Sequence, residues 1–221
     1  MSSLLSGSTD WNRYYSASIG FASITRWLSS HKILRLLRRN CDSTYPLAIC
    51  ELGGANSCFI QILCQGLLVE RYHVIDSCSY GLQLLHKKRP QAHVQLSWEM
   101  GDVLLPQPSA AMPFDLVFSV GLIEHFDKAG TRHAIAAHFA KVRPGGLVLI
   151  TFPTPTLVYR CLRALAERLG QWKFPDERPL QQVEVRECCR AHGQVLHESL
   201  NYGAIFTQAY VLVRAKGLQT A

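Results

Sequence analysis

In CELGGANSCF, residues 50–59, an acid and two adjacent glycines separate two apolar segments. The apolar run at 47–50 precedes it and is typical of a strand buried on both faces. The apolar run at 59–63 follows it and is typical of a helix capped by Asn56 or Ser57. Glycines between a strand and a helix N-terminus leave bare backbone N–H groups that a ligand can approach closely. The stretch therefore predicts a ligand-binding turn, provided that a parallel sheet surrounds it.

Length and composition fit a single globular domain. The 221 residues are 48% hydrophobic and 18% charged, which is enough to bury a sizeable core. The sequence holds no apolar run of about 20 residues, the length that a membrane span needs. Its start, MSSLLSGSTDW, lacks the basic stretch and the long apolar core of a secretion signal. We therefore expect a cytoplasmic protein without a membrane partner.

The cysteines and the basic residues predict neither a metal site nor a nucleic-acid module. In a cytoplasmic setting the eight cysteines are expected as buried thiols, and they form no paired CxxC ligand sets. The residues behind the net charge of +7 gather at 31–40, 86–90 and 160–168, interleaved with apolar residues at helical spacing. This pattern indicates solvated helix faces, although the charge can attract an anionic substrate or an acidic carrier protein. No dense basic tract is present, so we expect no nucleic-acid partner.

Apolar runs alternate with helical patterns along most of the chain. A helical pattern covers 17–40, and strands are expected at 47–52, 72–76, 93–98, 114–120 and 146–152. Helices are expected at 57–68, 79–88, 128–142 and 156–170. Residues 195–216 hold two strand-like runs around Asn201-Tyr202-Gly203, which predict a closing hairpin-like pair. The alternation predicts right-handed crossovers and a parallel sheet with helices on both faces.

Five motifs follow one another in a familiar order. They are AICELGGANS (48–57), YHVIDSCS (72–79), MGDV (100–103), FDLVFSVGLIEHF (114–126) and VRPGGLVLITFP (142–153). From about residue 45 to the C-terminus, this order resembles the class I S-adenosylmethionine-dependent methyltransferases. The resemblance implies an α/β fold: a seven-stranded, mostly parallel sheet with helices on both faces and an antiparallel last strand. The chain departs from the common glycine pattern at Asn56, which follows Ala55 where a further glycine or small residue is usual.

The resemblance also implies how the single domain is organised. An N-terminal helical lid would occupy 1–45, and the methyltransferase-like domain 46–221. Trp11, Tyr14 and Tyr15 resemble the aromatic lid that covers the acceptor in related enzymes, and Tyr14 is a candidate catalytic residue. Aromatic faces attract a sulfonium through cation–π contact. The alternative is that these rings only pack an N-terminal helix.

The first group of implied cofactor-binding residues surrounds the glycine turn. Gly53 and Gly54 resemble the loop whose backbone lies against the methionine portion of the cofactor, although they could form a tight turn and nothing more. Glu51 could neutralise the cofactor's ammonium through backbone or water. Asp76 is placed to accept both ribose hydroxyls, the alternative being a helix N-cap for the segment that starts near Ser79.

The second group lies on the following strands. Asp102 resembles the acid that accepts the adenine amino group, and Val103 offers a backbone N–H and an apolar wall. The alternative for Asp102 is a surface turn. Ser77 and Ser119 complete the cofactor-binding residues that the resemblance implies.

Glu124 and His125 are the candidate catalytic pair. In the family this segment lines the space between the sulfonium and the acceptor. Histidine has a suitable pKa to accept a proton at neutral pH. The resemblance favours a positioning role instead, with His125 packed against the cofactor. Methyl transfer mainly needs alignment and the exclusion of water, so no triad is expected. No set of residues predicts a divalent metal either.

The implied activity is methyl transfer from S-adenosylmethionine to a small or medium organic acceptor, such as a biosynthetic intermediate, by in-line displacement. The segment 172–180 lies where family members carry acceptor-recognition insertions. A first alternative is cyclisation of the aminobutyl chain of S-adenosylmethionine to an azetidine-2-carboxylate-type amino acid, with release of methylthioadenosine. A second is a binding-only module of the same fold. A nicotinamide dinucleotide enzyme is disfavoured because GGAN is not GxGxxG.

Overall fold

The computed structural model describes residues 8–16, 22–88, 90–105, 113–201 and 207–217, with the backbone alone over 22–27. The strands are β1 (Leu47–Leu52), β2 (Val69–Asp76), β3 (Gln95–Met100), β4 (Phe114–Val120), β5 (Val142–Pro153), β6 (Gly193–Asn201) and β7 (Gln208–Ala215). The α-helices are α1 (Trp11–Ser16), α2 (Ala22–Arg38), α3 (Phe59–Gly66), α4 (Ser79–Gln83), α5 (Lys128–Lys141), α6 (Leu157–Arg168) and α7 (Gln182–Arg190). Two short 3₁₀ helices are η1 (Leu84–Lys87) and η2 (Ile123–His125).

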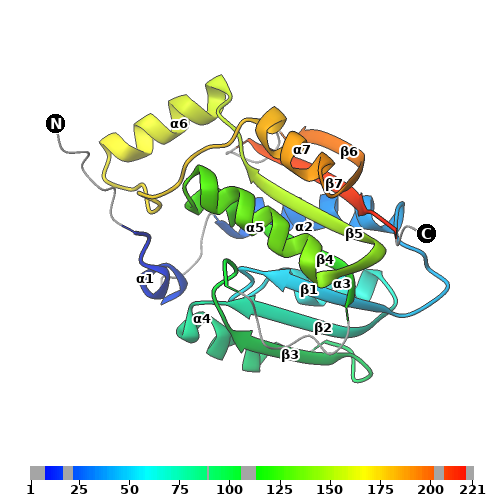
Figure 1. Cartoon of the computed structure of the whole chain (residues 1–221). Helices are drawn as coiled ribbons and strands as arrows, with labels where there is room; N and C mark the ends of the chain where they lie inside the picture. The colour runs from blue at the N-terminus through cyan, green and yellow to red at the C-terminus, as the bar shows by residue number, and fades with distance from the viewer. Residues whose placement is uncertain (1–7, 17–21, 89, 106–112, 202–206, 218–221) are drawn as a thin grey trace.

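The seven strands form one sheet in the order β3-β2-β1-β4-β5-β7-β6 (Figure 1). β1 pairs in parallel with β2 on one side and with β4 on the other, so the strand order reverses at the boundary between β1 and β4. β7 runs antiparallel to both β5 and β6. The predicted mostly parallel sheet with an antiparallel last strand is confirmed. The predicted hairpin-like pair is β6 and β7, and the residues that connect them, 202–206, lie outside the described part.

Alternate residues of the central strands enter two different apolar cores, because successive side chains of a strand point to opposite faces. Ile49 packs with buried residues of α2 and α3. Its neighbour Cys50 packs with buried residues of α5 and α7. Figure 1 shows α5 in front of the sheet and α2 behind it. Helices therefore cover both faces, as expected, and β1 is buried along its whole length.

The N-terminal helices occupy different places. α2 packs on the sheet, with Ile33 and Leu37 fully buried, and its Lys32 Nζ donates to Leu200 O at 3.1 Å. α1 packs against α4, so that a Cβ built on Gly81 would come 2.9 Å from Cδ2 of Tyr15. The division into a lid at 1–45 and a domain at 46–221 stays a prediction.

Some predicted boundaries are wrong. β2 begins at Val69 rather than at residue 72. β3 spans Gln95–Met100 rather than 93–98, because this edge strand has mostly half-exposed residues and no apolar run to fix its limits. The predicted helix at 79–88 divides into α4 and η1. The helix α7 was not predicted, because its charged sequence buries only two residues, Val185 and Cys189.

The cap of α3 is also different from the prediction. Cys58 is the N-cap and its side chain makes no capping hydrogen bond. Ser57, two residues before the helix begins, instead accepts at its Oγ from the N–H of Phe59 at 3.1 Å. Asn56 adopts a left-handed conformation with φ +51° and belongs to the preceding turn. Within the described residues, no helix has both the length and the apolar character that a membrane crossing requires.

Candidate cofactor and acceptor site

The turn after β1 depends on its two glycines. Gly53 has a φ of +69°, and a Cβ built on it would lie 2.9 Å from Cδ1 of Leu122. A Cβ built on Gly54 would lie 2.6 Å from Cγ and Cδ of Glu51. A left-handed backbone is costly for residues other than glycine, and distances below 3 Å force atoms apart. The backbone of this turn is therefore packed closely between β1 and the segment that follows β4.

Glu51 lies beneath the turn and is buried, with 3% of its surface exposed. The hydroxyl of Tyr72 on β2 donates to its Oε2 at 2.6 Å. Burial raises the pKa of Glu51 to about 7, although hydrogen bonds from Ser57 and Tyr72 partly offset this effect. The sequence predicted Glu51 as a site residue, but its partner Tyr72 was missed because β2 supplies it from the neighbouring strand. A carboxyl group that can gain or lose its proton near neutral pH thus lies against Gly54.

Asp76 at the end of β2 holds the turn in place. Its Oδ2 accepts from the N–H of Ala55 at 2.9 Å, and its Oδ1 accepts from the N–H of Cys78 at 2.7 Å. Burial raises the pKa of Asp76, although these backbone N–H groups work in the opposite direction. The N-cap of α4 is Cys78, so Asp76 supports the helix entry without being its cap. A carboxylate has about four lone-pair positions, so acceptor capacity is left for ribose hydroxyls.

The other predicted cofactor-binding residues differ in their exposure. Ser77 is exposed at the end of β2, and Val103 is buried among apolar residues that include Ile75. Asp102 is exposed, and its Oδ1 accepts from the N–H of Leu104 at 2.9 Å. This local contact forms the surface turn that was the alternative for Asp102.

Ser119 lies inside the protein, with its hydroxyl bound to α5. His138 Nε2 lies 2.9 Å from Ser119 Oγ, and His138 Nδ1 lies 2.6 Å from the carbonyl oxygen of Ala134. A carbonyl only accepts, so Nδ1 carries the proton and Nε2 accepts from the serine hydroxyl. Burial lowers the pKa of His138 to about 4, which keeps the ring neutral. This pair was not predicted from the sequence, because its two residues lie on different elements.

His125 follows β4 on η2 and is held by an acid from a distant segment. Its Nδ1 lies 3.0 Å from Oδ1 of Asp176. Asp176 in turn accepts from the N–H of Thr9 at 3.0 Å and from the Thr9 hydroxyl. Burial lowers the pKa of His125, although Asp176 acts in the opposite direction, so the imidazole is neutral at pH 7. Thr9 and Asp176 were not singled out from the sequence, since only the fold brings them to His125.

Aromatic rings surround His125. We call Trp11, Tyr14, Tyr15 and Phe174 the aromatic cluster. The ring of Trp11 lies 4.9 Å from that of His125 in an edge-on arrangement, and the ring of Tyr14 lies 5.3 Å from that of Phe174. The structure thus brings Tyr14 and His125, both predicted from the sequence, into one group of side chains. Two chain segments, α1 and the loop at 172–180, meet here over the end of β4.

Glu124 is the most deeply buried acid of this region, with 2% of its surface exposed. Its Oε2 has no hydrogen-bond partner among the described residues. Burial, and then the nearby carboxylates of Glu177 and Asp176, raise its pKa well above the usual range of a glutamate. Glu124 and His125 are therefore adjacent in the sequence but lie in different electrostatic surroundings.

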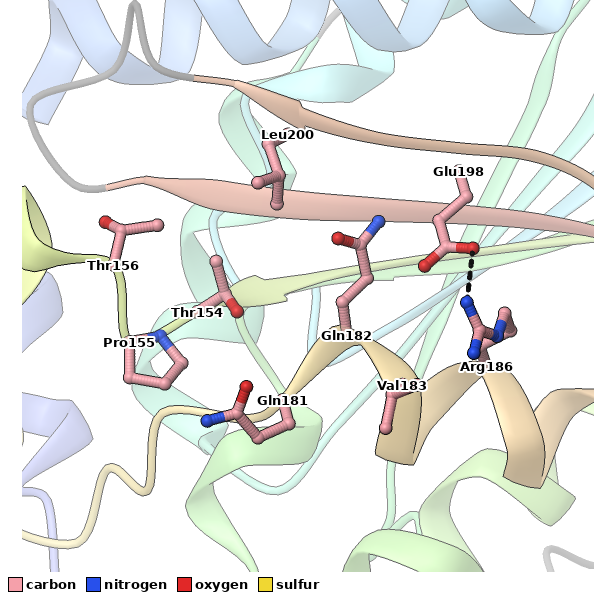
Figure 2. Close-up of a pocket in the computed structure, with 9 residues that line it drawn as sticks. All are labelled: Thr154, Pro155, Thr156, Gln181, Gln182, Val183, Arg186, Glu198 and Leu200. Atoms are coloured by element: carbon pink, nitrogen blue, oxygen red, sulfur yellow. Dashed lines mark ion pairs between the residues drawn. The ribbon is translucent and has the colours of Figure 1, made fainter.

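A separate groove of about 360 Å³ lies at the ends of β5 and β6 (Figure 2). It is lined by Thr154, Pro155, Thr156, Gln181, Gln182, Val183, Arg186, Glu198 and Leu200. Figure 2 shows the ion pair across it, in which Arg186 Nη1 lies 3.5 Å from Glu198 Oε2. None of the site residues predicted from the sequence lines this groove.

The fold matches several solved methyltransferases. Magnesium protoporphyrin IX methyltransferase from Synechocystis, with bound S-adenosylhomocysteine, is 12% identical over 93% of each chain, with a TM-score of 0.68. N-methyltransferase NodS from Bradyrhizobium japonicum, in complex with S-adenosylhomocysteine, is 19% identical over 84% of this chain and 86% of its own, with a TM-score of 0.60. An S-adenosylmethionine-dependent methyltransferase from Clostridium acetobutylicum is 12% identical over 94% of this chain and 96% of its own, with a TM-score of 0.65.

Comparison of sequences found no match, whereas comparison of structures did. No protein-family model matches the sequence, and no curated protein matches it significantly. At identities of 12 to 19%, these structures show the fold of the chain but not its substrate. The strand order, the glycine turn and these structures agree: the chain has the fold of the class I S-adenosylmethionine-dependent methyltransferases.

Proposed function

We propose that this protein is an S-adenosylmethionine-dependent methyltransferase acting on a small or medium organic acceptor. One observation carries the proposal: the Gly53–Gly54 turn lies at the boundary of β1 and β4, where the strand order reverses, and Asp76 holds it in place. Open α/β sheets bind nucleotide-like ligands at this point, outside the carboxyl ends of the strands. The solved structures with bound S-adenosylhomocysteine support the same cofactor.

The described residues around the turn fit this cofactor chemically. Glu51 supplies a buried carboxyl group for the ammonium of the methionine portion. Asp76 has acceptor capacity for the ribose hydroxyls, and Asp102 and Val103 are assigned to the adenine. The bound sulfonium would supply an already activated methyl group. The protein then needs to orient the acceptor in line with it and to exclude water.

His125 and the aromatic cluster are assigned to the acceptor. The cluster comes from two segments that meet at the end of β4, and its rings supply apolar walls that exclude water. The neutral His125 is fixed in direction by Asp176, which in turn is held by Thr9. We assign His125 a positioning role, because displacement at a sulfonium depends mainly on alignment. Tyr14 is assigned to the wall of the same space.

Product analysis tests the reaction. The purified chain is incubated with S-adenosylmethionine and a panel of small amines, phenols, carboxylic acids and thiols, and the nucleoside products are separated by chromatography. Methyl transfer gives S-adenosylhomocysteine in amounts that depend on one class of acceptor. Methylthioadenosine formed without any acceptor would contradict methyl transfer and indicate cyclisation of the aminobutyl chain.

A further inference from the structure

We propose that Glu124, His125 and Glu177 form a binding site for a divalent cation. Each offers one ligand atom, and these three atoms lie within 4.8 Å of one another. Glu124 and His125 come from η2, whereas Glu177 comes from the loop that precedes α7. The sequence predicted no metal site, because two neighbouring residues alone do not form one and only the fold adds the third.

The decisive side chain is Glu124. It is 98% buried, and its Oε2 has no hydrogen-bond partner among the residues that the structure describes. Burial of a carboxylate oxygen without a partner is unfavourable in free energy, since the oxygen loses its hydrogen bonds to water and forms no others. The backbone carbonyl of Glu124 is occupied by the N–H of Arg178 at 2.9 Å, which holds the residue in place. The side chain thus lies ready for a cation.

Acidic side chains outnumber the basic groups that pair with them around the site. Three carboxylates gather here, those of Glu124, Asp176 and Glu177. Within the described part of the chain, Arg163 is the guanidinium in ion-pair range of one of them, with Nη1 3.9 Å from Oε1 of Glu177, and it is shared with Glu167. Arg178 pairs with Glu184 instead. A divalent cation would displace the proton from Glu124 and offset the charge of the ionised carboxylates.

Its neighbours give His125 the surroundings of a metal ligand. When Nδ1–H donates to Asp176, Nε2 keeps its lone pair for a cation. Histidine ligands in metal sites commonly donate their other nitrogen to a carboxylate in this way, which fixes the ring. The Tyr159 hydroxyl donates to Oε1 of Glu177, so a second ligand is also oriented by a neighbour.

The ligand types favour a cation that accepts both imidazole and carboxylate. Zn²⁺ and Mn²⁺ do so, whereas Mg²⁺ prefers an all-oxygen shell. Three protein ligands leave at least one coordination position open. The cation would lie beside the aromatic cluster and could bind an oxygen or nitrogen of the acceptor, a role that rests on the proposed function. Binding of the cation itself does not depend on it.

Titration of the full-length protein with Mn²⁺ after removal of metals by EDTA tests the site. Mn²⁺ is the better probe, because Zn²⁺ also binds cysteine thiolates, which are soft ligands. We expect one Mn²⁺ per chain by calorimetry, with the affinity at least tenfold weaker in Glu124→Gln and in Glu177→Gln. Glu187→Gln is the matched control, since Glu187 is an exposed acid on α7 that pairs with Arg186 and Arg190. Equal Mn²⁺ affinity in Glu124→Gln and the parent would overturn the site.

Thermal unfolding adds a readout that does not need activity. Without metal, Glu124→Gln should be at least as stable as the parent, because the amide is neutral and nearly isosteric. Mn²⁺ should raise the melting temperature of the parent and of Glu187→Gln but leave that of Glu124→Gln unchanged. S-adenosylhomocysteine binding is measured on the same samples. If the parent binds S-adenosylhomocysteine but no Mn²⁺, the cation site is wrong and the proposed function stands. If the parent binds Mn²⁺ but no S-adenosylhomocysteine, the proposed function is wrong and the cation site stands.

Discussion

The carboxylate of Asp76 accepts a hydrogen bond from the backbone N–H of Ala55 at 2.9 Å, and this contact ties the end of β2 to the glycine turn after β1. A second bond, from the N–H of Cys78, comes from the residue before α4. The same side chain therefore shapes the turn and lies where we place the ribose. Its two roles are separable by experiment.

Asp76→Asn should weaken both stability and cofactor binding. An amide keeps one accepting oxygen but turns a donor toward a backbone N–H, and a lost bond to a charged group costs about 1.5–3 kcal/mol. The affinity for S-adenosylhomocysteine should fall at least tenfold. Calorimetry with the 2′,3′-dideoxy analogue of S-adenosylhomocysteine separates the structural role of Asp76 from its role in binding the ribose. The affinity of the parent should fall much more than that of the variant when the analogue replaces S-adenosylhomocysteine. Equal losses would leave Asp76 with a purely structural role.

Gly53→Ala should destabilise the protein more than Gly145→Ala. Both glycines have positive φ, +69° and +76°, so both alanines carry the strain of about 1–2 kcal/mol of a left-handed residue. A Cβ at Gly53 would also meet Leu122 at 2.9 Å, whereas one at Gly145 would meet nothing within 4 Å. Urea unfolding measures the difference, and calorimetry should show weaker S-adenosylhomocysteine binding for Gly53→Ala alone. Equal effects of the two substitutions on binding would show that the turn is not part of the site.

Cofactor binding should release a proton near pH 6. The pKa of Glu51 is raised to about 7 from its ordinary value of 4.5, because the group is buried. A ligand ammonium beside it favours the ionised form and lowers this pKa, so the affinity for S-adenosylhomocysteine should rise as the pH rises from about 5 to 7. Calorimetry in buffers of different ionisation enthalpy counts the released protons. Glu51→Gln should abolish the release, and an unchanged proton count in this variant would assign the proton to another group.

The same pKa has a consequence for folding. Between about pH 4.5 and 7, the folded chain keeps a proton on Glu51 that the unfolded chain has already lost. Its contribution to stability is therefore fully present below pH 4.5 and is lost as the pH rises through about 7. Tyr72→Phe removes a hydroxyl that favours the ionised form, so the loss should shift to higher pH. Urea unfolding of the cofactor-free protein across this range measures the shift.

His125→Asn should reduce turnover and cofactor or acceptor binding together, because His125 has a positioning role in this account. The acceptor identified by product analysis is used for steady-state kinetics, together with analogues of different pKa. Asp176→Asn should act in the same direction but more weakly, since its amide oxygen can still accept from His125 Nδ1. A loss of turnover by a factor of about 10²–10⁴ that depends on acceptor pKa, with binding intact, would establish His125 as a general base instead.

Much of the fold follows from local patterns in the sequence. The continuous apolar run of β1 and the apolar residues of β4 and β5 mark strands buried on both faces, and the glycines after β1 mark the turn. The edge strand β3 and the helix α7 were misplaced or missed, because each buries few side chains and so has a weak apolar period.

The sequence predicted individual residues of the site but not the contacts between them. Glu51, Asp76 and His125 stand in recognisable positions of their motifs. Their partners Tyr72, Ala55 and Asp176 were not predicted, because these contacts depend on strand register and on a loop that returns to the site from far along the chain. The same loop supplies Glu177 to the proposed cation site, and no local sequence pattern predicts this site.

The identity of the cofactor is tested by calorimetric titration of the folded, full-length protein with S-adenosylhomocysteine and, separately, with NAD. We expect saturable one-to-one binding of S-adenosylhomocysteine, displaced by S-adenosylmethionine, and no binding of NAD. The absence of saturable binding of S-adenosylhomocysteine, or binding of NAD to the same site, would contradict it.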